Sequence, residues 1–159
     1  MIIREITSSE KGMYLSFFRE GLKSDPDNFR IDLRDPEVFP TIDKDDSFTL
    51  GAFQDDHLIG VVSFQRDGDN RIKLQHKGWL IRMLVDPSQR GKGVGTSLIQ
   101  ALISQVRLLG DVEQINLTVV SEKSKSLYAH LGFEVFAEEK NAVKSDGIYL
   151  TEYQMVLFL

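Results

Sequence analysis

Apolar residues recur along this chain with two periods, and these periods predict the order of its elements. A spacing of three or four residues indicates a helix, while alternation or a short unbroken apolar run indicates a strand. On this basis the predicted strands are 2–6, 48–53, 58–64, 72–85, 115–120, 133–137 and 148–158. Helices are predicted after the first strand to about Lys23, over 94–109 and over 121–131.

Residues that begin and end regular structure support these boundaries. Thr7 and Glu10 have the spacing of a capping box, and Gly110 follows the second helix as a C-terminal cap. The pairs Asp55-Asp56 and Asp146-Gly147 suit the turns of two hairpins. Three of the four prolines lie between residues 25 and 46, so this segment is predicted to be irregular, with room for one short helix.

The resulting order is β-α-β-β-β-α-β-α-β-β, which combines hairpins with helical crossovers. Hairpins join antiparallel strands and helical crossovers join parallel ones, so the order predicts an α/β fold with a mixed sheet covered by helices. No repeat, low-complexity tract or linker divides the sequence. We therefore expect one domain over residues 1–159.

Composition narrows the range of functions. The formal net charge of −5 argues against a general nucleic-acid binder and favours a cationic substrate, although solubility explains the same charge equally well. The chain has no cysteine, which excludes disulfides, thiolate nucleophiles and zinc–thiolate sites. The start lacks the pattern of a signal peptide and no apolar run is long enough to span a bilayer, so we expect no membrane partner and a cytoplasmic location.

The segment from Val85 to Thr96 carries the clearest chemical signal. A predicted strand ends there, glycine occupies every second position at Gly91, Gly93 and Gly95, and a helix begins. Glycine lets backbone N–H groups approach a ligand, and the helix N-terminus adds partial positive charge, so the segment suits a pyrophosphate. A plain glycine-rich turn is the alternative that needs no ligand.

Two known phosphate motifs do not fit this loop. A Walker A loop requires Ser or Thr after Gly-Lys, but Gly93 follows Lys92. A dinucleotide fingerprint requires its third glycine at the position that Thr96 occupies. The pattern Arg/Gln-x-x-Gly-x-Gly/Ala does fit, through Arg90, Gly93 and Gly95, and it resembles the acetyl-CoA loop of the GNAT superfamily of N-acetyltransferases.

The flanks of the loop extend this resemblance. Val85-Asp86-Pro87 resembles the family's apolar strand ending in Val-x-Pro, and residues 127–133 resemble its Leu-Tyr-x-x-x-Gly-Phe motif. The resemblance covers the chain from about Phe48 to the C-terminus. It implies a mixed, mostly antiparallel sheet with splayed central strands and flanking helices.

The resemblance also implies the parts of an active site. Acetyl-CoA is the implied co-substrate, with its pantetheine arm between the strands ending at Val85 and beginning near Ile115. A backbone N–H near Leu84 would polarise the thioester, and Tyr128 would protonate the thiolate in a direct transfer without an acyl-enzyme. The implied cofactor-binding residues are Leu84, Val85, Arg90, Gly91, Lys92, Gly93, Val94, Gly95, Thr96, Ser121, Ser124 and Tyr128.

The general base is the part that the resemblance leaves open. Many relatives carry a Glu where this chain has Trp79, and they often have Asn and Ala where it has Ser121 and Ser124. His76 is a candidate base because histidine titrates near neutrality, with a structural hydrogen-bonded role as the alternative. The three histidines, His57, His76 and His130, are too scattered to suggest a metal site.

Three functions follow from these observations. The leading one is an N-acetyltransferase acting on a primary amine of a small molecule, with residues 25–46 forming part of the acceptor wall. The second is a protein acetyltransferase acting on a lysine or an N-terminus. The third is a non-catalytic acyl-CoA-binding module, which the missing Glu favours and Tyr128 disfavours. Glu152 and Tyr149 lie on the last strand near the family's acceptor site, but ordinary strand residues explain them as well. A homodimer is compatible with the resemblance.

Overall fold

The computed structural model describes residues 1–35, 44, 46–68 and 71–159, and these form a sheet of seven strands. Their order across the sheet is β1-β2-β3-β4-β5-β7-β6. Strands β4 and β5 pair in parallel, and the other neighbours pair antiparallel. The bounds are β1 Ile2–Glu5, β2 Phe48–Gln54, β3 His57–Arg66, β4 Lys77–Val85, β5 Gln114–Val119, β6 Glu134–Ser145 and β7 Ile148–Phe158. The predicted element order and the mixed, mostly antiparallel sheet are confirmed.

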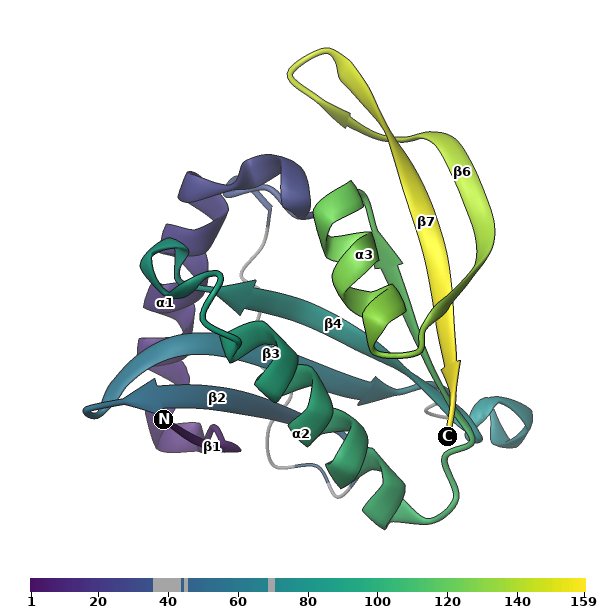
Figure 1. Ribbon diagram of the computed structural model, residues 1–159, viewed down its shortest axis with the longest axis horizontal. Helices are drawn as coiled ribbons and strands as arrows, with labels where there is room; N and C mark the ends of the chain where they lie inside the picture. Colours follow the sequence, from purple (N-terminus) through teal and green to yellow (C-terminus); the bar gives the residue numbers. More distant parts are fainter. Residues whose placement is uncertain (36–43, 45, 69–70) are drawn as a thin grey trace.

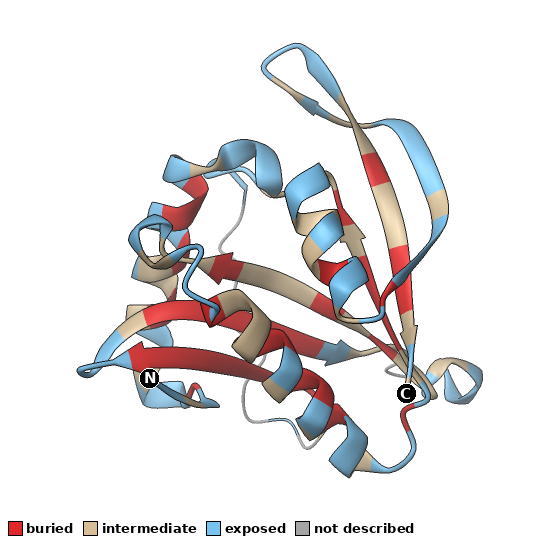
Figure 2. Cartoon of the chain, in the orientation of Figure 1, coloured by how far each residue is buried: buried red, intermediate tan, exposed pale blue. Residues whose placement is uncertain are grey.

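Helices cover both faces of this sheet (Figure 1). Helix α1 (Lys11–Ser24) packs on one face, while α2 (Val94–Leu109) and α3 (Glu122–His130) pack on the other. The core is correspondingly divided, and buried residues colour β2, β3 and the inner side of α2 in Figure 2. The α1 side of the core consists of Ile6, Tyr14, Phe18, Leu22, Val61 and Leu84. Among the described residues, no helix is long and apolar enough to cross a membrane.

The predicted strand over residues 72–85 is wrong at its beginning. Ile72–Leu74 is a single 3-10 turn, and β4 starts only at Lys77. The backbone N–H groups of Arg71 and Leu74 donate to the carbonyls three residues before them, at 2.7 and 2.8 Å, which closes successive turns. Apolar residues at 72 and 74 imitate strand alternation, yet Ile72 is 85 % exposed, so burial against the core does not hold it in the sheet.

The predicted strand over residues 133–137 is too short. Strand β6 continues to Ser145, and with β7 it forms a hairpin that extends beyond the rest of the sheet (Figure 1). Most β6 side chains are exposed, so no apolar alternation signals the strand in the sequence. The turn at Asp146-Gly147 is as predicted, with φ of 45° and 84°.

The described part of the segment after α1, residues 25–35, is irregular, as predicted, and its short helix is one 3-10 turn at Pro26–Asn28. Residues 36–43 and 45 of the predicted acceptor wall lie outside the described residues.

The separation of β4 from β5 is the feature that shapes the site. The two strands pair only where Lys77–Trp79 meets Gln114–Asn116. Further along, Leu84 is paired with Val61 of β3, and Ile81 is paired with Ser63. Two residues of β4 therefore lie opposite the single residue Val62 of β3, so β4 holds one extra residue. Arg82 has φ of 56°, which locates this β-bulge. A bulge bends its strand and increases the twist, and β4 diverges from β5 in Figure 1.

Candidate active site

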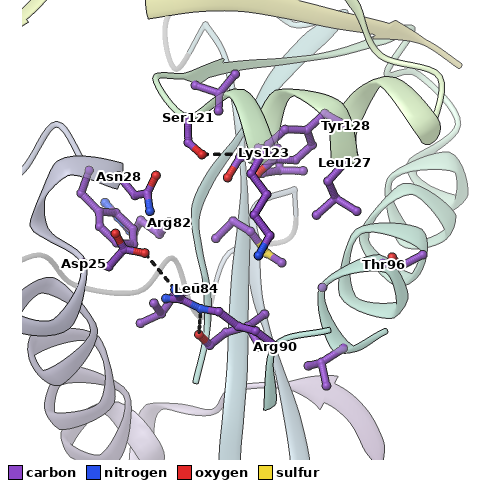
Figure 3. A pocket seen from close by; sticks show the side chains of 18 of the residues that line it. Asp25, Asn28, Arg82, Leu84, Arg90, Thr96, Ser121, Lys123, Leu127 and Tyr128 are labelled. Carbon is purple, nitrogen blue, oxygen red and sulfur yellow. Dashed lines mark hydrogen bonds and ion pairs between the residues drawn. The ribbon is translucent and has the colours of Figure 1, made fainter. Parts of the chain in front are cut away.

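A cavity of about 880 Å³ occupies the place where β4 and β5 separate. Its volume lies within the roughly 300–1,000 Å³ of sites for small ligands and cofactors. Figure 3 shows it between the loop before α2, helix α3 and the segment after α1. The lining residues are 80–85 of β4, 118–119 of β5, most of the loop and helix start over 89–96, residues 121, 123, 124, 126–128 and 130 around α3, and 25 and 28–31 after α1.

The glycine loop has the conformation that its sequence predicts. Gly91 and Gly93 have φ of 77° and 83°, and a Cβ added at either position would meet no atom within 4 Å. Helix α2 begins at Val94, so the N–H groups of its first turn have no partner within the helix. A Cβ on Gly95 would lie 3.2 Å from Met83 Cε, so this glycine allows α2 to pack closely on β4. The loop therefore offers backbone donors beside open space.

Arg90 connects the loop to the segment after α1. Its Nη1 lies 3.0 Å from Asp25 Oδ2, and its Nε donates to the Val85 carbonyl at 3.2 Å. Figure 3 draws both interactions across the cavity mouth. Lys92 is exposed and does not belong to the described cavity lining. Its Nζ donates to Gln89 Oε1 at 3.1 Å. The structure thus brings Arg90 to the cavity and leaves Lys92 on the outer side of the loop.

The direction of the β4 backbone shifts the predicted oxyanion donor. The Asp86 N–H donates to the Ile59 carbonyl of β3 at 3.0 Å. Two residues earlier, Leu84 is paired with Val61, so the backbone N–H of Leu84 also points toward β3. The Val85 carbonyl points the other way, since it accepts from Arg90. Successive residues of a strand alternate in direction, so the N–H groups of Val85 and Met83 face the gap and that of Leu84 does not.

Helix α3 holds the predicted tyrosine at the cavity. Ser121 caps the helix by accepting from the Ser124 N–H at 3.3 Å, and both serines line the cavity. Tyr128 is 6 % exposed, and its ring meets Phe133 edge-on with 5.6 Å between centroids. Burial raises the pKa of Tyr128 well above its usual range, so its hydroxyl keeps its proton at neutral pH.

The candidate base lies away from these residues. His76 is in the turn before β4, where its carbonyl accepts from the Glu113 N–H at 2.7 Å, and it does not belong to the described lining. Trp79 lies in the paired part of β4, and its Nε1 donates to Asp67 Oδ2 at 3.4 Å. His130 reaches the cavity rim, with Nδ1 2.6 Å from the Ser126 carbonyl. No group of three metal-ligating side chains occurs among the described residues.

Sequence reasoning missed two arginines of the lining. Arg82 occupies the β4 bulge, and a bulge at a non-glycine residue leaves no mark in the apolar pattern. Arg30 comes from the irregular segment after α1, where periodicity gives no information about direction. The charge of these residues was visible in the sequence, but their place in the fold was not.

Comparison with known proteins decides the family. The Acetyltransferase (GNAT) family matches residues 13–133. The chain belongs to the GNAT acetyltransferase family. As a GNAT acetyltransferase it is an acyltransferase, and acetyl-CoA is the acetyl donor typical of this family.

Solved structures share the GNAT fold at low sequence identity. A GNAT-family acetyltransferase from Streptococcus pneumoniae superposes with a TM-score of 0.86 at 21 % identity over 99 % of both chains. The ribosomal-protein-alanine N-acetyltransferase from Brucella melitensis gives 0.78 at 19 % identity over 100 % of both chains. A phosphinothricin acetyltransferase from Sinorhizobium meliloti, in complex with AcCoA, gives 0.81 at 19 % identity over 99 % of this chain and 88 % of that one.

Proposed function

We propose that this GNAT acetyltransferase binds acetyl-CoA in the cavity between β4 and β5 and transfers the acetyl group to a primary amine. The gap between the strands carries the proposal. Beyond the three paired residues of β4, each strand leaves an unpaired edge that lines the cavity. Such edges bind an extended ligand through backbone hydrogen bonds, and the pantetheine arm, with its amide groups, is a ligand of that kind.

The N-terminus of α2 is the proposed pyrophosphate site. The free N–H groups of Val94, Gly95 and Thr96 and the positive end of the helix favour an anion there. The open space beside Gly91 and Gly93 supports a close approach of phosphate oxygens. Lys92 is left out of this proposed set because its side chain lies outside the described lining.

The thioester carbonyl is assigned to the backbone N–H of Met83. A cofactor whose pyrophosphate lies at the loop runs along β4 away from it, so it meets Val85 before Met83. The Val85 N–H then suits the pantetheine arm, and the Met83 N–H suits the carbonyl. A donor held in a strand needs no rearrangement when negative charge develops on that oxygen, which is the condition for oxyanion stabilisation.

Tyr128 and water are assigned the proton transfers. An alkyl amine has a pKa of roughly 10, so it must lose a proton before it attacks. Because Trp79 and His76 lie outside the described lining, we assign that proton to water in the open cavity. The amine nitrogen then bonds to the acetyl carbon and the carbon–sulfur bond breaks. The Tyr128 hydroxyl protonates the departing thiolate and is restored, through water, by the second proton that the nitrogen loses. With no cysteine in the chain, direct transfer without a thioester on the enzyme is the proposed course.

A small molecule is the favoured acceptor. The pantetheine arm takes part of the 880 Å³, and residues 28–31 wall the remainder, which suits a compact acceptor better than a peptide. A protein N-terminus is the second candidate, because structures of the same fold include ribosomal-protein acetyltransferases from Brucella melitensis and Escherichia coli.

The test is turnover of acetyl-CoA against a panel of small primary amines and peptides with free N-termini. We expect release of free CoA thiol that depends on the amine, one added acetyl group on the acceptor, and no added mass on the protein. Binding of acetyl-CoA without release of thiol for any panel member would contradict the proposed activity. Turnover of peptides alone would replace the small molecule by a protein acceptor.

A further inference from the structure

Two arginines line the side of the cavity that we expect the cofactor to leave open. Among the described lining residues, Asp25 is the one acidic side chain, and it is ion-paired with Arg90. Arg30 and Arg82 add two guanidinium groups, and Figure 3 shows Arg82 near Asn28 and Asp25, across the cavity from Tyr128. The acceptor wall therefore carries cationic side chains, one of them ion-paired with the buried Glu152, although the whole chain has a net charge of −5.

Arg82 is held beside the reacting groups by the β4 bulge. It directly precedes Met83, so its Cα lies about 3.8 Å from that of the proposed oxyanion donor. A positive φ at a residue other than glycine is strained, and such strain concentrates at functional sites. The Arg82 side chain lies on the α1 side of the sheet, close to Tyr14. Burial raises the pKa of Tyr14 to about 12, and the positive charge of Arg82 opposes this rise.

Arg30 is held by a buried carboxylate. Its Nε lies 3.3 Å from Glu152 Oε2, and the two side chains are 62 % and 2 % exposed. Glu152 comes from β7, and its Oε2 has no hydrogen-bond partner within the described residues. A guanidinium has five N–H donors, so a contact with Glu152 through Nε leaves further donors of Arg30 for a second carboxylate.

We propose that the acceptor carries a carboxylate beside its reactive amine, and that Arg82 and Arg30 bind this carboxylate. This inference rests on the proposed acetyltransferase activity and names its substrate class. Arg82 is the chain neighbour of Met83, so an acceptor that carries its carboxylate close to its amine, as an amino acid does, is the class that we infer. A polyamine or another polycation would place its second charge against two guanidinium groups, which costs binding energy.

Matched acceptors test this directly. Each of several amino acids is compared with its carboxamide and with the corresponding amine that lacks the carboxyl group. We expect kcat/KM for the amino acid to exceed that of both analogues at least tenfold, with the difference in KM. Arg82→Gln and Arg30→Gln should lower this preference toward one while the Kd for acetyl-CoA, measured by calorimetry, stays within about twofold of wild type.

Two further variants make the result decisive. Arg34→Gln removes an exposed arginine of the same segment that pairs with Asp32 outside the main cavity, so it should keep the full preference. Arg82→Lys keeps the charge but loses the fork, so it should retain part of the preference and covers the case in which Arg82→Gln fails to fold.

The outcomes separate the two levels of the proposal. A wild-type enzyme that acetylates carboxamides or polyamines as well as amino acids overturns the carboxylate site and leaves the acetyltransferase standing. So does a preference that survives in folded Arg82→Gln and Arg30→Gln. A protein that does not bind acetyl-CoA overturns the proposed activity itself.

Discussion

Tyr128 combines a packed ring with a hydroxyl at the cavity. The ring contacts Phe133 and belongs to the larger core cluster, so packing alone explains its burial. The hydroxyl needs another explanation, and a buried phenol with a raised pKa keeps its proton at neutral pH and so remains a hydrogen-bond donor. A departing thiolate accepts this hydrogen bond. Because a thiol is a stronger acid than this phenol, Tyr128 passes a proton to the thiolate only as it regains one from the amine, and this relay is the role assigned to it.

Replacing Tyr128 by phenylalanine separates these two roles. Tyr128→Phe keeps the ring, so stability and acetyl-CoA affinity should change little. General acid catalysis contributes about 10²–10⁴-fold, and the lower end applies because a thiolate leaves well unaided, so kcat should fall about tenfold or more. Steady-state kinetics at saturating substrates measure this. Tyr153→Phe, outside the described cavity lining, is the matched control and should keep the wild-type kcat. A folded Tyr128→Phe enzyme with unchanged kcat, where chemistry limits the rate, removes Tyr128 from the mechanism.

Glu152 provides a second prediction at this scale. If it positions Arg30, Glu152→Gln should raise the KM for the acceptor severalfold and leave kcat and the affinity for acetyl-CoA nearly unchanged. The pH profile of kcat/KM should also keep its acidic limb. Loss of that limb together with a large fall in kcat would instead identify Glu152 as the base that takes the amine proton.

Two glycines with similar backbone angles, one at each end of α2, test whether the loop before this helix binds pyrophosphate. Gly93 begins α2 with φ of 83° and Gly110 ends it with φ of 79°, and both have open space at the Cβ position. Alanine at either site therefore carries a similar strain, roughly 1–2 kcal/mol. Gly93→Ala should weaken acetyl-CoA binding at least tenfold, while Gly110→Ala should lose similar stability and keep the affinity. Calorimetric titration compares them, and equal affinities in folded variants would falsify the pyrophosphate assignment.

The junction of β1 and α1 gives the fold a pH dependence. Arg4 and the Thr7 N–H hold the Glu10 carboxylate and lower its pKa from 4.5 to about 2. A lowered folded pKa contributes stability that is present above about pH 4.5 and is lost as pH falls through about 2. The pair is partly exposed, so we expect about 1 kcal/mol or less. Thermal unfolding of wild type and Glu10→Gln should therefore differ at neutral pH and converge near pH 2. A difference that persists at that pH assigns the effect to packing.

Helix α2 and strand β4 show which features of the fold could be predicted from the sequence and which could not. Helix α2 and its glycine cap were predicted at their observed ends, because the apolar stripe and Gly110 agree. The splayed strands followed from the family resemblance alone. The bulge at Arg82 was not predictable, since it depends on how β4 fits between β3 and β5, and this bulge decides that Met83 and Val85, rather than Leu84, face the gap.

At the scale of the whole molecule, net charge and local charge point to different substrates. The net charge of −5 favours a cationic acceptor, whereas Arg30 and Arg82 favour an acceptor with a carboxylate. A field from scattered surface acids is screened within about 10 Å at ordinary salt, while two guanidinium groups in the cavity act at contact distance. The cavity therefore outweighs the composition, and the composition remains an argument about solubility.

Amide hydrogen exchange with and without acetyl-CoA tests the central claim, that the cofactor lies between β4 and β5 with its pyrophosphate at the start of α2. At saturating acetyl-CoA, peptides covering residues 80–96 and 117–128 should exchange more slowly, because their N–H groups either bind the cofactor or are covered by it. Peptides from β2, on the far side of β3, should be unchanged and serve as the internal control. Slower exchange confined to other parts of the chain, with residues 80–96 unaffected, would contradict the account.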